Sequence, residues 1–348
     1  PVSTLAELID ASLLIVEHTQ EVRYRLLESV RAVGISHLDP SDREATHAAL
    51  AEWAVRSVAG WREHQDARVS GPTAALRDNT ALIDAALTWQ IDAERFDDAA
   101  RLAVNVALIV TDDPSADWLQ RLRSLPLRQA PEGEGEASAL LAVAAATAAW
   151  IAGDAAECNR LVGIARSQLD PGHDLFWCID FVACLAAVYG DNPDVAQRHA
   201  MAVHGHSRAP DFARATTVCA AALANTYSGS RAEADRLMAL DTQLLQNVGQ
   251  SVGFIDFTRA ELSAHDDPAG AVVLLERART KCDAAAHTYN HRIASIAHLG
   301  LLIRTHDTDR AADAAIELIA DCCHSGMWPQ AWIVARLCAE LLANRRQH

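Results

Sequence analysis

Aromatic residues are scarce in this chain: they make up 5% of its 348 residues, although hydrophobic residues make up 50%. Alanine supplies much of the apolar content. Because alanine has a high helix propensity and lets helices approach closely, this composition favours packed helices over a β-sheet. A chain of this length can bury a large core, either as two or three ordinary domains or as one long helical array.

Long apolar stretches and excess positive charge are also missing. The sequence has no uncharged apolar run of membrane-spanning length and no basic segment leading into an apolar one, so it predicts neither a membrane helix nor a secretory signal. The formal net charge of -16 disfavours direct binding to nucleic acid or to an anionic membrane. The cysteines lack a disulfide-framework spacing, which indicates reduced thiols and a cytoplasmic location.

Catalytic motifs are absent as well. The sequence contains no Gly-x-x-x-x-Gly-Lys-Ser/Thr phosphate loop and no Gly-x-Ser-x-Gly nucleophile turn. The single lysine, Lys281, lies in Arg-Thr-Lys-Cys, outside any glycine-rich turn. Acidic pairs such as Asp266 and Asp267 fall at expected helix starts, where helix capping explains them. We therefore expect neither an enzyme nor a cofactor in this chain.

A short phrase recurs through the C-terminal part of the chain: a polar turn, followed by a helix that opens with small residues. Its copies, roughly 40 residues apart, are Gly153-Asp154-Ala155-Ala156, Gly190-Asp191-Asn192-Pro193, Gly229-Ser230-Arg231-Ala232, Asp266-Asp267-Pro268-Ala269 and Asp307-Thr308-Asp309-Arg310. Repetition at this interval is typical of stacked helical hairpins, none of which buries its apolar face alone. The predicted fold class is all-α, a tetratricopeptide-like (TPR-like) α-solenoid.

The apolar spacing places the helices of these hairpins along the chain. We predict helix pairs at 137–152 and 154–168, 174–189 and 193–206, 210–227 and 230–247, 252–264 and 268–286, and 289–305 and 309–324. A last helix at 329–345 would cover the open end of the array. An earlier pair is predicted at 73–90 and 96–111, and the Pro- and Gly-containing stretch 112–136, with a short helix near Trp118, is the expected hinge.

The N-terminal residues follow a different pattern. Residues 3–12 have the spacing and cap of a helix, 13–17 and 22–26 indicate strands around a polar turn, and 27–38 return to helical spacing. This order is that of the end of a winged helix, so we expect a small winged-helix remnant with a β-hairpin before the solenoid. A long amphipathic helix is predicted at 41–66.

Two stretches of this region resemble a known family. They are Leu8-Ile9-Asp10-Ala11-Ser12-Leu13-Leu14 and Arg23-Tyr24-Arg25-Leu26-Leu27-Glu28-Ser29-Val30-Arg31. Together they resemble the end of the winged-helix segment in the STAND-class ATPases of actinobacterial transcriptional regulators, the AfsR-like and LuxR-type group, in which a TPR-like array follows. The resemblance implies that this chain is the C-terminal part of a regulator whose ATPase module lies upstream in the same polypeptide.

The resemblance and the helical pattern together predict the domain organisation. It comprises the tail of a winged-helix domain (1–38), a connecting helix (39–70), a first helical hairpin with the hinge loop (71–130) and the TPR-like array with its capping helix (131–348).

Two groups of side chains could carry chemistry, and each has a simpler explanation. His287 and His291 lie one helical turn apart, with His298 two turns further on, and could bind a metal ion; a polar stripe on a helix explains them more simply, so we predict no metal site. Cys322 and Cys323 precede a histidine that could lower a thiol pKa for redox sensing, but inert, partly buried thiols are the simpler explanation.

The first helices of stacked hairpins line the concave face of a solenoid, so a ligand or partner is expected there. Candidate binding residues on these helices, some of which could equally belong to the core, are Phe176, Trp177, Asp180, Arg214, Tyr227, Asp256, Arg259, Tyr289, Asn290 and Arg292. We expect a non-catalytic sensor that binds a protein, a peptide or a small inducer and relays its occupancy to the upstream ATPase and DNA-binding parts. The rival interpretations are a self-association scaffold, which would form a homo-oligomer, and an all-helical metal protein or enzyme.

Overall fold

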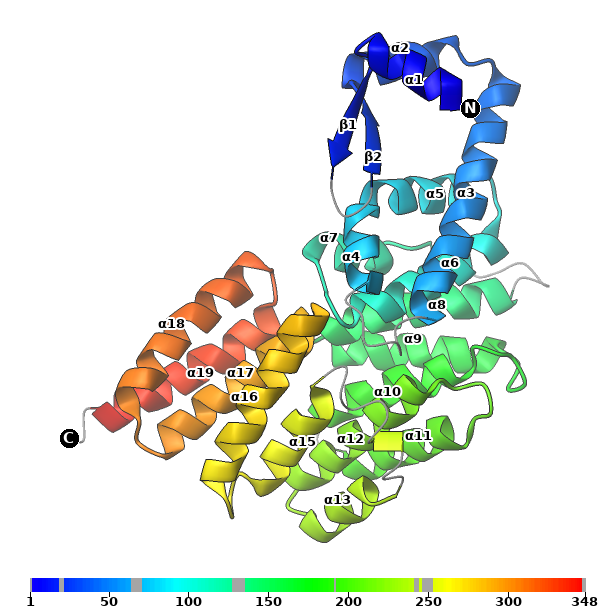
Figure 1. Cartoon of the computed structure of the whole chain (residues 1–348). Helices are drawn as coiled ribbons and strands as arrows, with labels where there is room; N and C mark the ends of the chain where they lie inside the picture. The colour runs from blue at the N-terminus through cyan, green and yellow to red at the C-terminus, as the bar shows by residue number, and fades with distance from the viewer. Residues whose placement is uncertain are drawn as a thin grey trace. The chain divides into compact units, whose positions relative to one another are not determined.

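A computed structural model describes residues 2–18, 22–63, 71–126, 135–190, 192–240, 244–245 and 253–345. These residues are mostly helical, and the sheet they contain has two strands (Figure 1). The predicted all-α solenoid class with a small β-hairpin is therefore confirmed. The contacts within the chain divide it into two compact units, Pro1–Trp53 and Ala54–His348.

The first unit has the predicted order of helix, strand, strand and helix. Its elements are α1 (Val2–Asp10), β1 (Leu14–His18), β2 (Val22–Leu26), α2 (Glu28–His37) and the first part of α3 (Pro40–Glu63). The strands pair antiparallel, with Leu14 opposite Leu26 and His18 opposite Val22. The tip of the predicted turn, 19–21, and the predicted end of the long helix, 64–66, lie outside the described residues.

The second unit continues α3 from Ala54 and then contains several shorter helices. They are α4 (Gly71–Asp78), α5 (Thr80–Asp92), α6 (Phe96–Val110) and α7 (Ala116–Arg123). The prediction of one helix at 73–90 is wrong, because the helix breaks at Asn79. The Asn79 side chain donates to the Ala75 carbonyl at 2.7 Å, and the Thr80 hydroxyl donates to the Leu76 carbonyl at 3.1 Å. The Asn79 backbone itself leaves the helical region, with φ -115 and ψ 13, and α5 begins at the next residue.

The repeated hairpins follow in the predicted order. They are α8 (Gly135–Ile151) with α9 (Ala155–Gln168), α10 (Trp177–Tyr189) with α11 (Pro193–Gly205), α12 (Asp211–Tyr227) with α13 (Arg231–Met238), α15 (Phe254–Ser263) with α16 (Pro268–Ala285), and α17 (Thr288–Arg304) with α18 (Thr308–His324), followed by α19 (Trp328–Arg345). One prediction is wrong here: the helix expected to reach residue 247 ends at Met238. The backbone N–H of Leu240 donates to the Leu237 carbonyl, three residues earlier. This is the hydrogen-bond pattern of a 3₁₀ turn, which often ends an α-helix.

The recurring polar turns cap the second helix of several hairpins. The side chains of Asp154, Asn192 and Asp267 each accept a hydrogen bond from the backbone N–H three residues later. In all five hairpins, the fourth residue after the residue that precedes the second helix is small and fully buried. These residues are Cys158, Ala196, Ala234, Ala271 and Ala311. These small side chains let the second helix pack closely on the first.

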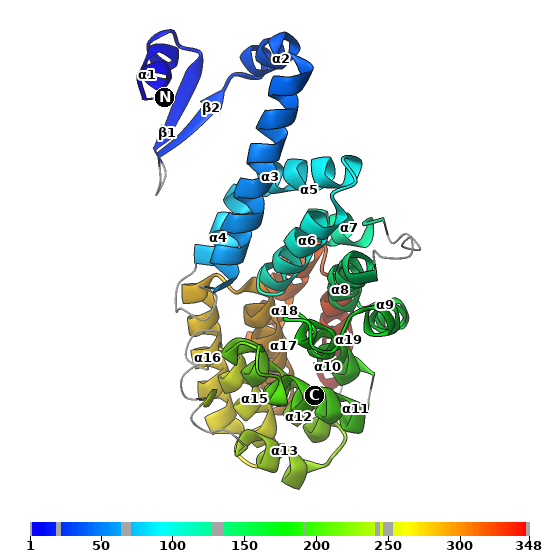
Figure 2. The same cartoon turned by 90° about the vertical axis from the view of Figure 1, so that its right-hand side faces the viewer.

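The hairpins form two layers. Each second helix packs on its own first helix, while the first helices pack on one another in the order α8, α10, α12, α15, α17, α19. In the turned view of Figure 2, the green hairpins α10–α11 and α12–α13 lie next to each other, and the yellow α15 follows α12. The inner layer is therefore made of first helices, which is the arrangement that the repeat pattern predicts.

The inner layer curls until late helices meet early ones. The backbone N–H of Tyr289, at the start of α17, donates to the Asp112 carbonyl at 3.1 Å. The ring of Tyr289 lies 5.6 Å from the ring of Trp150 at the end of α8. A Cβ on Gly153, directly after α8, would lie 2.8 Å from Cγ of Pro329 in α19. The inner face is thus closed into a pocket by contacts between segments far apart in the sequence.

Candidate functional site

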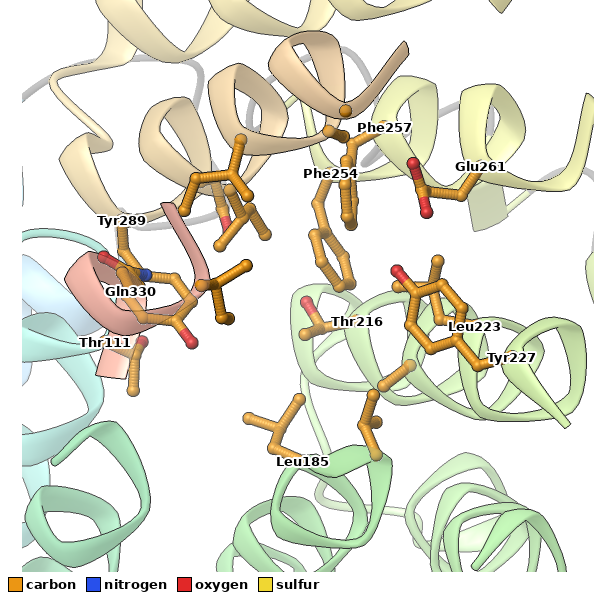
Figure 3. Close-up of a pocket in the computed structure, with 18 of the residues that line it drawn as sticks. Thr111, Leu185, Thr216, Leu223, Tyr227, Phe254, Phe257, Glu261, Tyr289 and Gln330 are labelled. Carbon is orange, nitrogen blue, oxygen red and sulfur yellow. The ribbon is translucent and has the colours of Figure 1, made fainter. Parts of the chain in front are cut away.

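The first helices enclose a pocket of about 710 Å³, which we call the inner pocket. Figure 3 shows side chains from several of these helices pointing into one space. The lining comes from the start of the loop after α6 and from α8, α10, α12, α15, α17 and α19. Its volume lies within the range of roughly 300–1,000 Å³ that small-molecule sites usually have.

One wall of the inner pocket is aromatic. Phe254 and Phe257 of α15 stack with ring centroids 5.7 Å apart, and both line the pocket. Phe181 of α10 and Phe212 of α12 meet edge to face at 6.1 Å. Trp177, which is buried behind them, contacts both rings at 6.0 and 6.1 Å. Edge-to-face and offset-stacked arrangements are the ones that aromatic rings prefer, so these rings form a well-packed apolar surface.

A carboxyl group lies beside this aromatic wall. Glu261 of α15 lies beside Tyr227 of α12 in Figure 3, and both line the pocket. Burial raises the pKa of Glu261 above its ordinary value, and the hydrogen bond with Tyr227 and the charge of Arg304 oppose this rise only in part. A carboxyl group with a raised pKa and a phenol hydroxyl therefore lie next to the aromatic wall of the pocket.

Two buried hydrogen-bond donors without partners mark another part of the pocket. The indole Nε1 of Trp150 and the amide Nε2 of Gln330 have no hydrogen-bond partner among the described residues. Their residues are 7% and 5% exposed, and both line the inner pocket. The Gln330 side chain is oriented by Arg292, whose guanidinium donates to Gln330 Oε1 at 3.3 Å. Buried donors are normally paired, so this region is suited to a ligand that carries an acceptor.

A second pocket of about 400 Å³ lies between α16, α17 and α18, and we call it the histidine pocket. Its lining includes His287, which precedes α17, His291, Ser295 and His298 of α17, and Arg279 of α16. Burial lowers the pKa of His291 and of His298, and the nearby Arg279 lowers both further. Both imidazoles are thus biased toward the neutral form.

Three sequence-predicted residues line the inner pocket: Tyr227, Tyr289 and Asn290. They lie on α12 and α17, as the repeat pattern predicts. Of the others, Trp177 belongs to the core and is 1% exposed, while Phe176 is partly buried and lies 5.9 Å below the Arg166 guanidinium.

Most of the charged candidates are hydrogen-bonded or ion-paired to other residues of the chain instead. Their partners are Arg166 and His199 for Asp180, Arg277 and Lys281 for Asp256, Asp321 and Gln330 for Arg292, and the His206 carbonyl for Arg214. Arg259 is exposed. Among these, none lines the inner pocket, and Arg292 lines the histidine pocket.

Several pocket residues were not among the candidates. Phe254, Phe257 and Glu261 share one face of α15 at spacings of three and four residues, and this helical spacing could have identified them. Gln330 could not have been found this way, because α19 was expected only to cap the array.

The metal and redox candidates have these surroundings. His287 Nδ1 lies 3.7 Å from an Asp112 carboxylate oxygen, and His291 Nε2 lies 3.4 Å from one of Asp283. Within the described ranges no group of three or more His, Cys, Asp or Glu side chains is arranged to hold a metal ion. Cys323 is exposed, whereas Cys322 is buried, and this burial raises its pKa to about 11.

Comparisons with models of protein families, with curated proteins and with solved structures find no match to this chain. Among the residues that the structure describes, no helix combines the length and the apolar character needed to cross a membrane.

Proposed function

We propose that this chain is a non-catalytic sensor region that binds a small effector in the inner pocket and relays its occupancy to an ATPase and a DNA-binding part upstream in the same polypeptide. The observation that carries the proposal is the aromatic-walled inner pocket built by successive first helices. The regulatory role rests on the sequence resemblance to AfsR-like and LuxR-type regulators. The cytoplasmic location that we propose with it rests on the cysteine pattern of the sequence.

The chemistry of the lining suggests what the effector is like. The stacked Phe254 and Phe257 favour a flat or extended apolar body. The unpaired donors of Trp150 and Gln330 favour a hydrogen-bond acceptor on that body. A carbonyl oxygen is one such acceptor, since it takes hydrogen bonds from N–H groups without needing a counter-charge. A small amphiphilic molecule meets these requirements within a pocket of about 710 Å³ that early and late helices border together.

The same arrangement provides a route for the signal. An effector in the inner pocket would contact early helices such as α8 and late ones such as α17 and α19 at once. Binding would therefore stabilise the curled form of the array over more open forms, which is the differential affinity that a population shift requires.

The proposal is tested with an uncharged fluorophore, N-phenyl-1-naphthylamine, whose emission increases in apolar surroundings. Ala297 of α17 is half-buried and lines the inner pocket, so Ala297→Trp should fill it and weaken probe binding at least about tenfold. Ala314 of α18 is also half-buried but lines the histidine pocket, so Ala314→Trp is the matched control and should leave probe binding unchanged.

Far-UV circular dichroism and the midpoint of urea unfolding would confirm that both variants fold. Lack of saturable probe binding to the wild-type protein would contradict the proposal. Equal binding to the wild type and to Ala297→Trp would contradict it as well, because the probe would then lie elsewhere.

A second candidate function, self-association, is supported by two exposed tryptophans. Trp328 and Trp332 lie one turn apart on α19 and are 65% and 77% exposed. Aromatic residues are enriched at interfaces between protein chains, and large exposed side chains on one helix face often mark them. In this alternative the partner would be a second copy of the chain.

A further inference from the structure

The histidine pocket concentrates buried polar atoms that have no partner. Among the described residues, Arg279 Nε, Ser295 Oγ and His298 Nε2 have no hydrogen bond, nor does His287 Nδ1, which lies 3.7 Å from an Asp112 carboxylate oxygen; all four residues line this one pocket. His287, Ser295 and His298 are each 6% exposed. Native proteins leave few buried polar groups unpaired, so such a cluster indicates that something else occupies the space.

The hydrogen-bonding roles of these atoms can be assigned. The Arg279 guanidinium can only donate, and its Nη1 lies 3.5 Å from His298 Nδ1, so Nδ1 is the acceptor. In a neutral His298 the proton is then on Nε2, which makes the unpaired Nε2 a donor. Arg279 Nε is a second unpaired donor, and the hydroxyl of Ser295, one turn before His298, can be a third.

The charges around the pocket distinguish Arg279 from the other arginines that line it. Arg77 pairs with Asp113, and Arg292 pairs with Asp321 at 2.6 Å. Arg279 has no carboxylate oxygen within salt-bridge distance in the described part of the chain, and its Nε atom is buried. Of the acidic residues that line the pocket, Asp321 is held by Arg292, Asp283 lies 3.4 Å from His291, and Glu317 is exposed. A partly buried cation without a counter-charge is costly unless a ligand supplies one.

We propose that the histidine pocket binds a small oxyanion, a carboxylate or a phosphate group, through Arg279, Ser295 and His298. The oxyanion accepts hydrogen bonds from Arg279 Nε, the Ser295 hydroxyl and His298 Nε2. Its negative charge also pairs with the positive charge of Arg279, which has no carboxylate partner among the residues that the structure describes. This site is separate from the inner pocket and does not depend on the function proposed for that pocket.

The test is isothermal titration calorimetry of the whole chain with inorganic phosphate and, separately, with succinate, each against chloride at the same ionic strength. Saturable binding of either anion is expected. Arg279→Met should weaken it at least about tenfold, and Ser295→Ala about threefold to tenfold. Which anion binds distinguishes a phosphate from a carboxylate ligand.

Matched controls lie outside the pocket. Arg236→Met removes the same charge from an arginine that pairs with Glu233 on α13, and Ser263→Ala removes a hydroxyl that donates to the Ala260 carbonyl on α15. Neither should alter anion binding. The proposal is overturned if neither anion binds, which would mean that the pocket holds water only, or if Arg279→Met and Ser295→Ala bind both anions as well as the wild type does.

Discussion

The two faces of helix α17 differ in polarity and in whether their buried polar atoms have hydrogen-bond partners. One face, with Tyr289, Ile293 and Gly300, lines the inner pocket and is mainly apolar. The other, with Ser295 and His298, lines the histidine pocket and carries buried polar atoms without partners. A single helix thus borders two cavities of opposite character. The apolar face needs only a ligand of suitable shape, whereas the polar face needs a ligand with specific hydrogen-bonding groups.

The largest predicted effect concerns the hairpin of α15 and α16, in which α15 lines the inner pocket and α16 lines the histidine pocket. Gly253, directly before α15, has φ +68, and a Cβ there would lie 2.5 Å from the Ala278 carbonyl oxygen and 2.7 Å from Cys282 Sγ. Gly253→Ala should lower the free energy of unfolding by about 2–4 kcal/mol, because the clash adds to the left-handed backbone strain. Gly229→Ala is the control: its φ is +83 but no atom lies within 4 Å, so only about 1 kcal/mol should be lost. Urea unfolding measures both, and equal losses would contradict the close packing of α15 on α16.

The next effect tests whether the hairpin is stabilised independently of the cavities. Burial alone would raise the pKa of Asp256, but hydrogen bonds from Arg277 and Lys281 outweigh it, so the pKa lies below its ordinary value. This contribution to stability is present above about pH 4 and is lost as the pH falls through the folded-state pKa. Asp256→Asn should cost about 1–3 kcal/mol at pH 7 and flatten the acid side of the stability profile. An unchanged acid profile would contradict this assignment, and probe binding at neutral pH should persist.

A smaller effect sharpens the chemistry of the inner pocket. Trp150→Phe removes an unpaired indole N–H and keeps an aromatic ring. It should weaken binding of a carbonyl-bearing fluorophore, 6-propionyl-2-dimethylaminonaphthalene, about threefold to tenfold and leave N-phenyl-1-naphthylamine binding unchanged. Trp118→Phe is the control, since Trp118 Nε1 is also buried without a partner but does not line the pocket. If both substitutions act alike on both fluorophores, the donor role of Trp150 is wrong.

The smallest effect on stability is expected at the surface of α19. Trp332 is 77% exposed, so Trp332→Ala should change the free energy of unfolding by less than about 0.5 kcal/mol. If self-association uses this face, sedimentation velocity should show a mass that rises with concentration in the wild type and not in the variant. A wild-type mass independent of concentration would remove the self-association alternative.

The sequence predicted the helical array well because its signals are local. Apolar spacing and the polar turns placed most helix boundaries within a few residues, and the buried Ala196 and Ala271 lie where close packing was expected. The break at Asn79 was missed because it is a change in backbone conformation at one residue, with φ -115 and ψ 13. Apolar spacing does not report such a change when helices continue on both sides of it.

The candidate site was only partly predictable. Tyr227 and Tyr289 line the inner pocket because they lie on the first helices of hairpins, which were expected to line the concave face. Asp180 and Asp256 lie on first helices too, but they pair with arginines 14 and 21 residues away on neighbouring helices. Such pairing depends on how the helices dock, and so does the approach of Gln330 to the pocket. The periodic pattern of one helix does not contain this information.

The most direct measurement is amide hydrogen exchange of the protein with and without saturating N-phenyl-1-naphthylamine, followed by mass spectrometry. If the probe occupies the inner pocket and stabilises the curled array, the probe should slow exchange in the inner helices α10, α12, α15, α17 and α19 and leave the outer helices α9, α11 and α18 nearly unchanged. Slower exchange confined to the outer helices, or no change in any helix at saturation, would contradict an effector site on the inner face.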